Sequence, residues 1–320
     1  MKKIKLSFLL LLIFATTFAQ VDKYKYVDDA VAKIGKMPTK NVAEIAANIT
    51  KDFKENEDKT RAIFYWIANN IAIDPKATKR NETKNTLPEL VIQNRKTTPL
   101  GFSLLLQEMC SYAKIRCLTV DGFVKNFAEE INVKGEEKNY SWNVVQLGKS
   151  PETWYYIDAC RASGTIDAKF TTYTKEFTSQ YFFTDKKLFN LVYFPDNMAW
   201  QLGGDNNPKS VVSFYQLPII SNYAVALEMR KLEPRTGLIK TKINIPINFS
   251  FAINNENVIN KITLVKGDGK KAAKEEAMNF TNSDGNITFS YTFKKEEEFQ
   301  LKIMVNGKVL LQYLVEVKEK

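Results

Sequence analysis

Residues 99–124 decide the fold of this chain, and they read PLGFSLLLQEMCSYAKIRCLTVDGFV. Pro99 suits the first position of a helix, because a proline has no backbone N–H that would need a partner there. The apolar spacing that follows predicts a helix over residues 101–114. Its inward side chains are predicted to be Leu104, Leu105 and Met109. Residues 117–124 then alternate as a β-strand does, so a strand follows the helix directly.

The segments on either side extend this pattern. Residues 21–73 are predicted to be helical, residues 75–86 to form a polar loop and residues 87–92 to form a short helix. Further strands are predicted at residues 140–147 and 154–157. Helices followed by neighbouring strands predict an α+β fold, in which the helices pack on an antiparallel sheet.

From about residue 240 onward the pattern is that of strands alone. Apolar residues alternate strictly in three runs, which are Ile243 to Ile253, Ile287 to Phe293 and Phe299 to Val305. Turns are predicted at Gly267-Asp268-Gly269, Ser283-Asp284-Gly285 and Asn306-Gly307. About six or seven strands in such a length are typical of an immunoglobulin-like β-sandwich. We place this predicted domain at residues 235–320.

The composition excludes several kinds of site. The chain has 320 residues, 44% of them hydrophobic, which is ample for two domains. It contains no histidine, so Ser-His nucleophiles, Cys-His nucleophiles and His-ligated metals are excluded. Its three cysteines are too few for a four-cysteine zinc site or a disulfide scaffold. We therefore expect no metal and no cofactor.

The net charge of +10 does not indicate a nucleic-acid surface. Basic residues are scattered among acidic ones, as where Lys294-Lys295 come directly before three glutamates. A nucleic-acid site would gather the basic side chains into a patch. We expect a mixed, solvated surface and no nucleic-acid partner.

The first 19 residues have the pattern of a secretory signal peptide. Lysines at the start precede an apolar run over residues 6–14, and small residues flank Phe18 before a cleavage point after Ala19. The run is shorter than the roughly 20 residues that span a bilayer. We expect a secreted or periplasmic protein, with no membrane span in the mature chain.

Four segments of the chain, in their order, carry a family resemblance. They are DKTRAIFYWI at residues 58–67, RKTTPLGF at 95–102, YSWNV at 140–144 and WYYID at 154–158. Together they resemble the transglutaminase-like domain of the papain-type cysteine-nucleophile superfamily, with a core over residues 57–164. An extension over residues 165–234 resembles the kyphoscoliosis-peptidase-like branch. Its matching pieces are YFP at 193–195, WQL at 200–202 and LP at 217–218. The resemblance implies a transglutaminase-like domain over residues 20–234, before the sandwich.

The resemblance also locates the catalytic positions. In that family a cysteine at a helix N-terminus is the nucleophile, a histidine takes its proton and an aspartate orients the histidine. The matching positions here hold Pro99, Tyr140 and Asp158. Proline offers no nucleophile, and a phenol with a pKa of about 10 is a poor base at neutral pH. The resemblance therefore implies a degenerate triad, in which Asp158 caps a turn or accepts a hydrogen bond from Tyr140.

Two relocated sites remain as alternatives. One would use a cysteine without a histidine to activate it, and the candidates are Cys110, Cys117 and Cys160. The other would be a serine–lysine dyad, and the candidates are Ser103 or Ser141 with Lys96. Such a lysine must be desolvated to act as a base. Cys110 and Cys117 are also open to pairing as a disulfide, because export permits disulfides.

The remnant groove is the predicted binding site. Its predicted residues are Phe102, Tyr140, Trp142, Asn143, Trp154 and Asp158. The alternative for Trp142 and Trp154 is a place in the core. We expect a secreted, catalytically inactive transglutaminase-like protein that binds or scaffolds a peptide, protein or glycan of the cell envelope. The rival functions are a histidine-free hydrolase, acting as a peptidase or amidase, and adhesion through the sandwich.

Overall fold

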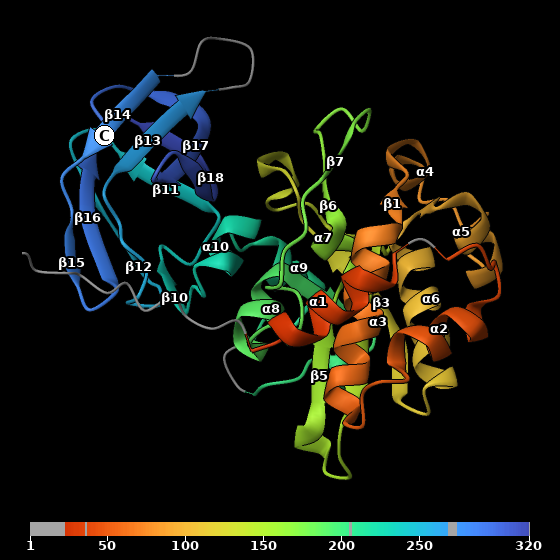
Figure 1. Ribbon diagram of the computed structural model, residues 1–320. Helices are drawn as coiled ribbons and strands as arrows, with labels where there is room; N and C mark the ends of the chain where they lie inside the picture. The colour runs from red at the N-terminus through yellow and green to blue at the C-terminus, as the bar shows by residue number, and fades with distance from the viewer. Residues whose placement is uncertain (1–22, 36, 205–206, 268–273, 320) are drawn as a thin grey trace, which may run out of the picture.

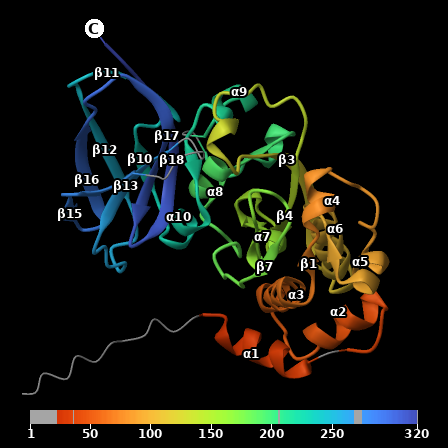
Figure 2. The same ribbon diagram turned by 90° about the horizontal axis from the view of Figure 1, so that it is seen from above.

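The computed structural model describes residues 23–35, 37–204, 207–267 and 274–319. The predicted signal peptide and part of the turn predicted at residues 267–269 lie outside these residues. Figures 1 and 2 show a lobe of helices around a sheet, and a second lobe made of the strands nearest the C-terminus. The α+β fold class is confirmed, with helices that pack on an antiparallel sheet and a strand-rich C-terminal region that forms a sandwich.

The first lobe begins with a run of helices, of which α1, α2 and α6 pack against α3. The helices are α1 (Lys25–Ile34), α2 (Val42–Thr50), α3 (Asn56–Asn70), α4 (Pro75–Lys79), α5 (Pro88–Asn94) and α6 (Pro99–Tyr112). Helix α4 stands where the sequence predicted only a loop. It forms because the Asp74 carboxylate accepts a hydrogen bond from the N–H of Ala77 and Pro75 occupies the first helical turn.

Helix α6 packs on a four-stranded antiparallel sheet with the order β5-β4-β3-β8. The strands are β3 (Arg116–Val124), β4 (Tyr140–Gln146), β5 (Trp154–Ile157) and β8 (Tyr193–Pro195). Three of them were predicted from the sequence, and β8 was not. Leu105 and Met109 of α6 are buried as predicted, whereas Leu104 is only half-buried.

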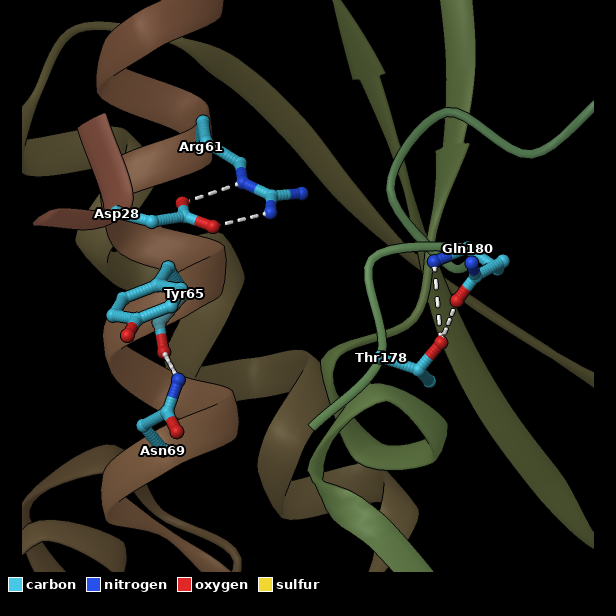
Figure 3. A network of polar contacts seen from close by, with 6 residues as sticks. All are labelled: Asp28, Arg61, Tyr65, Asn69, Thr178 and Gln180. Carbon is cyan, nitrogen blue, oxygen red and sulfur yellow. Dashed lines mark hydrogen bonds and ion pairs between the residues drawn. The ribbon is translucent and has the colours of Figure 1, made fainter. Parts of the chain in front are cut away.

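A buried ion pair ties α1 to α3, as Figure 3 shows. The Nε of Arg61 donates to Asp28 Oδ1 at 2.8 Å, and Nη2 donates to Oδ2 at 2.6 Å. The Arg61 side chain is fully buried, and its guanidinium lies about 5 Å from the ring centres of Tyr24 and Phe182. Figure 3 also shows Asn69 donating to the carbonyl of Tyr65 on α3, and a contact between the Thr178 and Gln180 side chains.

Short elements lie between the main helices and strands of the first lobe and lead on to the second lobe. They are β1 (Ala72–Ile73), β2 (Lys96–Thr97), η1 (Ala128–Glu130), η2 (Pro151–Thr153), α7 (Ala159–Ser163), β6 (Gly164–Ile166), β7 (Tyr173–Lys175), α8 (Lys186–Val192), η3 (Met198–Trp200), α9 (Val211–Tyr215), β9 (Ile219–Ile220) and α10 (Asn222–Ala226). In the described part of the chain, no helix has the length and apolar character needed to cross a membrane.

The second lobe is a sandwich of two sheets. One has the order β10-β12-β16-β15 and the other β11-β18-β17-β13-β14. The strands are β10 (Lys231–Glu233), β11 (Leu238–Lys242), β12 (Pro246–Ala252), β13 (Ile262–Gly267), β14 (Lys274–Met278), β15 (Thr281–Ser283), β16 (Asn286–Thr292), β17 (Glu297–Val305) and β18 (Lys308–Lys318).

Two details of the sandwich differ from the sequence prediction. The boundary predicted at residue 235 falls after β10, which already pairs with β12. The alternation predicted from Ile243 is interrupted, because β12 begins only at Pro246 and Ile245 is 51% exposed. Further along β12, Phe249 and Phe251 are buried as the alternation predicted.

The two lobes are joined by main-chain hydrogen bonds. Strand β9 pairs with β18, with Ile219 opposite Gln312 and Ile220 opposite Leu311. The N–H of Ser221 donates to the carbonyl of Leu310. This pairing fixes one sheet of the sandwich beside the first lobe, where a cavity lies between them.

Candidate functional site

A cavity of about 500 Å³ lies between the two lobes. Pro99 and Tyr140, two of the three predicted triad positions, both line it. Cys160 and Arg161 of α7 lie on the same wall, and the sandwich contributes Lys302 among others. The volume is within the range of pockets that bind small ligands.

Pro99 occupies the first helical turn of α6. Its fixed backbone angle suits this position, and its missing N–H leaves no orphan donor. A cysteine in this place would gain a lower pKa from the helix dipole. Proline presents only methylene groups to the cavity, so this wall can exclude water but cannot attack a substrate.

Tyr140 begins β4 and is wedged between charged and aromatic groups. Its ring centre lies 5.9 Å from that of Tyr193 and 5.6 Å from the Arg161 guanidinium. Its hydroxyl is buried and has no hydrogen-bond partner among the described residues. Burial raises the pKa of Tyr140 well above its usual value, and the nearby Asp158 charge raises it further. The phenol therefore stays protonated at neutral pH and can donate a hydrogen bond.

Asp158 is a helix cap in this structure. Its Oδ1 accepts from the N–H of Arg161 at 2.9 Å, which closes the first turn of α7. Its Oδ2 accepts from the hydroxyl of Tyr193 at 2.6 Å. Burial raises the pKa of Asp158, while both of these hydrogen bonds lower it. Both carboxylate oxygens are thus engaged in holding α7 and β8.

The other predicted binding residues lie in the core. Trp142, Phe102 and Asn143 are each 1% exposed, and Trp154 is 8% exposed. Asn143 donates to the carbonyl of Ser103 and so joins β4 to α6. None of these four, nor Asp158, lines the cavity; of the predicted set only Tyr140 does. Their burial follows from the sheet, which turns alternate side chains of β4 toward α6 or α8.

Of the three candidate cysteines, Cys160 lies at the cavity, whereas Cys110 and Cys117 lie next to each other away from it. Cys160 lines the cavity, but burial raises the pKa of its thiol well above the usual value and Asp158 adds to the rise. Cys110 and Cys117 are buried, do not line the cavity and carry free thiols. A thiol that stays protonated is a weak nucleophile.

The serine–lysine dyad is not assembled among the described residues. Lys96 forms an ion pair with Asp74 at 3.2 Å, and its side chain is 61% exposed. Ser141 donates to Asp121 at 2.7 Å, and Ser103 is buried. Lys96 is therefore not desolvated, as the base of such a dyad would have to be.

Sequence reasoning missed Lys125, which lies in the wall of the cavity. It is 5% exposed, and its Nζ donates to the backbone carbonyls of Phe214 and Leu217. Burial lowers the pKa of Lys125 to about 7, and the charge of Glu130 acts in the opposite direction. The local sequence holds no signal for this, because the two carbonyls come 89 and 92 residues later.

The pKa of Lys125 predicts that stability rises with pH. The pKa is about 7 in the folded chain and about 10.5 when the lysine is exposed by unfolding. Between these values the unfolded chain binds one more proton, so the free energy of unfolding increases with pH, by up to about 1.4 kcal/mol per pH unit. Urea unfolding of wild type and Lys125→Met at pH 7, 8 and 9 measures this. We expect the wild type to gain about 1 kcal/mol per unit relative to the variant. A difference that is constant with pH would contradict the assignment.

Comparisons with known proteins find similarity over part of the chain. Residues 43–159 match the family model of the transglutaminase-like superfamily. The chain is 27% identical over 199 residues to kyphoscoliosis peptidase of Mus musculus, covering 62% of this chain and 29% of that protein. It is 27% identical over 217 residues to kyphoscoliosis peptidase of Homo sapiens, covering 68% of this chain and 31% of that protein. The chain thus spans about a third of the length of these relatives.

One solved structure is similar to about half of the chain. It is described as a crystal structure of a TGase, with 18% identity, a TM-score of 0.28 and coverage of 52% of this chain and 37% of that one.

Proposed function

Residues 43–159 form a domain of the transglutaminase-like superfamily, and from this premise we propose that the chain is a catalytically inactive, exported binding protein of the cell envelope. Its cavity between the lobes holds a ligand instead of processing a substrate. Export rests on the signal-peptide pattern of the first 19 residues.

The observation that carries the proposal is Pro99 at the start of α6, on the wall of the cavity. Covalent catalysis in this fold needs a nucleophile at that helix end and a base that faces it. Here the first position has no reactive atom, and the second holds a protonated phenol. Asp158 is fully engaged as a helix cap and as the acceptor for Tyr193.

The volume and the lining of the cavity support a binding function. The cavity keeps a volume of about 500 Å³, and it combines apolar walls with a buried hydroxyl that has no partner among the described residues. Such a mixture of apolar surface with a few placed polar groups is typical of ligand sites. A peptide or a glycan of the envelope fits this description.

A histidine-free hydrolase is the second candidate, and the place of Cys160 in the cavity favours it. Its thiol would have to lose a proton in a site where burial and the Asp158 carboxylate both oppose the thiolate. The binding function does not require this step.

The test combines binding with activity on the purified chain from residue 20 onward. Peptide and glycan arrays and envelope fractions are probed with wild type, Tyr140→Ala and Tyr112→Ala. Tyr112 is the matched control, because it is 51% exposed on α6 and does not line the cavity. We expect at least one defined probe to lose about tenfold or more in affinity with Tyr140→Ala only, a loss of the size of one buried contact.

Peptide hydrolysis and amine incorporation are measured on the same samples. We expect neither activity in wild type, nor any change with Cys160→Ser. Thiol-dependent turnover that disappears in Cys160→Ser would overturn the proposal in favour of the second candidate. Binding that Tyr140→Ala leaves untouched would move the ligand away from the cavity.

A further inference from the structure

Most of the charged residues that line the cavity between the lobes are basic. Lys79, Lys125, Arg161 and Lys302 line it, against one carboxylate, that of Glu130, among the described lining residues. Arg161 keeps its charge at any physiological pH. Glu130 uses one oxygen to accept the N–H groups of Asn126 and Phe127, and the buried Asp158 carboxylate, which does not line the cavity, interacts with the charge of Arg161.

Arg161 and Lys302 face the cavity from different lobes. Arg161 is carried by α7, and Lys302 by β17 of the sandwich. Lys302 stands opposite Gln312 in the β17–β18 pairing, and both line the cavity. Lys302 takes part in none of the ion pairs found among the described residues. Arg161 donates to the neutral side chain of Asn126 at 3.2 Å and also interacts with the side chains of Tyr181 and Asp158. Lys125 differs from them, since its amine is held by two backbone carbonyls.

Two hydroxyls in the cavity wall are also without partners. The side-chain oxygens of Thr78 and Tyr140 are buried, and neither has a hydrogen-bond partner among the described residues. Leaving a buried hydroxyl unpaired costs about 1–3 kcal/mol, so native structures pair such groups with protein, water or ligand. Hydroxyls can donate to an anion as readily as the cations can attract it.

Apolar side chains line the cavity beside a set of uncharged polar ones, which are Asn81, Asn126, Asn139, Thr165, Ser221, Asn222 and Gln312. Pro99, Ile166, Phe170, Ile220 and Val309 contribute hydrocarbon surface from both lobes. A ligand that matches this lining has one anionic end and an apolar body.

We propose that this cavity binds the C-terminal carboxylate of a peptide whose last residue is apolar, with Arg161 and Lys302 flanking the carboxylate and the hydroxyls of Tyr140 and Thr78 donating to it. The proposal rests on the binding function proposed above and names the chemistry of its ligand. It also makes the sandwich part of the site, because Lys302 belongs to β17.

The experiment compares two probes that differ only in the anionic end. They are the tripeptide N-acetyl-Ala-Ala-Leu with a free carboxylate and the same tripeptide with a C-terminal carboxamide, titrated into the chain from residue 20 onward by calorimetry. Hydrogen bonds to charged groups are roughly twice as strong as neutral ones. We therefore expect the carboxylate form to bind at least about tenfold more tightly than the carboxamide.

Substitutions of two lysines on the sandwich test where the carboxylate of the peptide binds. Lys302→Gln is expected to lower the affinity for the carboxylate peptide about five- to tenfold and to leave the affinity for the carboxamide peptide unchanged. Lys318→Gln is the matched control, because this exposed lysine of β18 does not line the cavity. It is expected to change neither affinity.

The outcomes separate this inference from the proposed function. If both peptides bind equally well and Tyr140→Ala abolishes the binding of both, the carboxylate assignment is overturned. The proposed binding function is then still supported. Absence of peptide binding, together with binding of a uronate-ended disaccharide, would overturn the peptide assignment. Binding of neither probe, with no array ligand dependent on Tyr140, would overturn both.

Discussion

Asp28→Asn is expected to lower the free energy of unfolding by about 3–5 kcal/mol. The carboxylate of Asp28 accepts two hydrogen bonds from Arg61, whose side chain is completely buried. Removing the negative charge leaves the guanidinium in an apolar setting without its counter-ion, and this desolvation is the main source of the loss. Urea unfolding at pH 7, followed by far-UV circular dichroism, measures the change.

The matched control is Asp29→Asn on the same helix. Asp29 pairs with Lys25 at 2.6 Å, but both side chains are more than half exposed. Solvent screens such a pair, so we expect a loss of less than about 0.5 kcal/mol. Equal losses for the two variants would show that the buried pair does not anchor α1 to α3.

Trp142→Ala is expected to lower the free energy of unfolding by about 3–5 kcal/mol as well, for a different reason. Trp142 is 1% exposed, and its ring lies 5.2 Å from Tyr193 and 5.8 Å from Phe189. Gly122 makes room for it on β3, since a Cβ there would lie 2.6 Å from the ring. Truncation would leave a large cavity that the sheet cannot close.

Tyr112→Ala serves as the control for truncating an aromatic side chain, because Tyr112 is 51% exposed. We expect Tyr112→Ala to change the free energy of unfolding by less than about 0.5 kcal/mol, as surface substitutions usually do. A small effect of Trp142→Ala would mean that its place in the core is not required. Because Trp142→Ala is expected to destabilise the fold strongly, a loss of ligand binding in that variant would reflect unfolding. Tyr140 is therefore the residue to replace when ligand binding in the cavity is tested.

The local pattern of the sequence determined much of the first lobe. The helix after Pro99 and the strands at 116–124, 140–146 and 154–157 were predicted because each depends on the spacing of its own apolar residues. The absence of histidine and the residues Pro99 and Tyr140 also follow from the sequence alone. Short elements were harder to predict: α4 needs the cap from Asp74, and β8 exists only through its pairing with β3.

The candidate site, in contrast, was decided by tertiary structure. The predicted aromatic groove became core, because burial depends on what packs against a side chain and not on its type. Lys125 is buried by carbonyls about 90 residues later in the chain, and Lys302 reaches the cavity because β9 pairs with β18. Such contacts join distant segments and leave no local periodicity. The sequence thus determined the helices, the main strands and the residue types at the predicted triad positions, while the packing of the two lobes decided which side chains meet in the cavity.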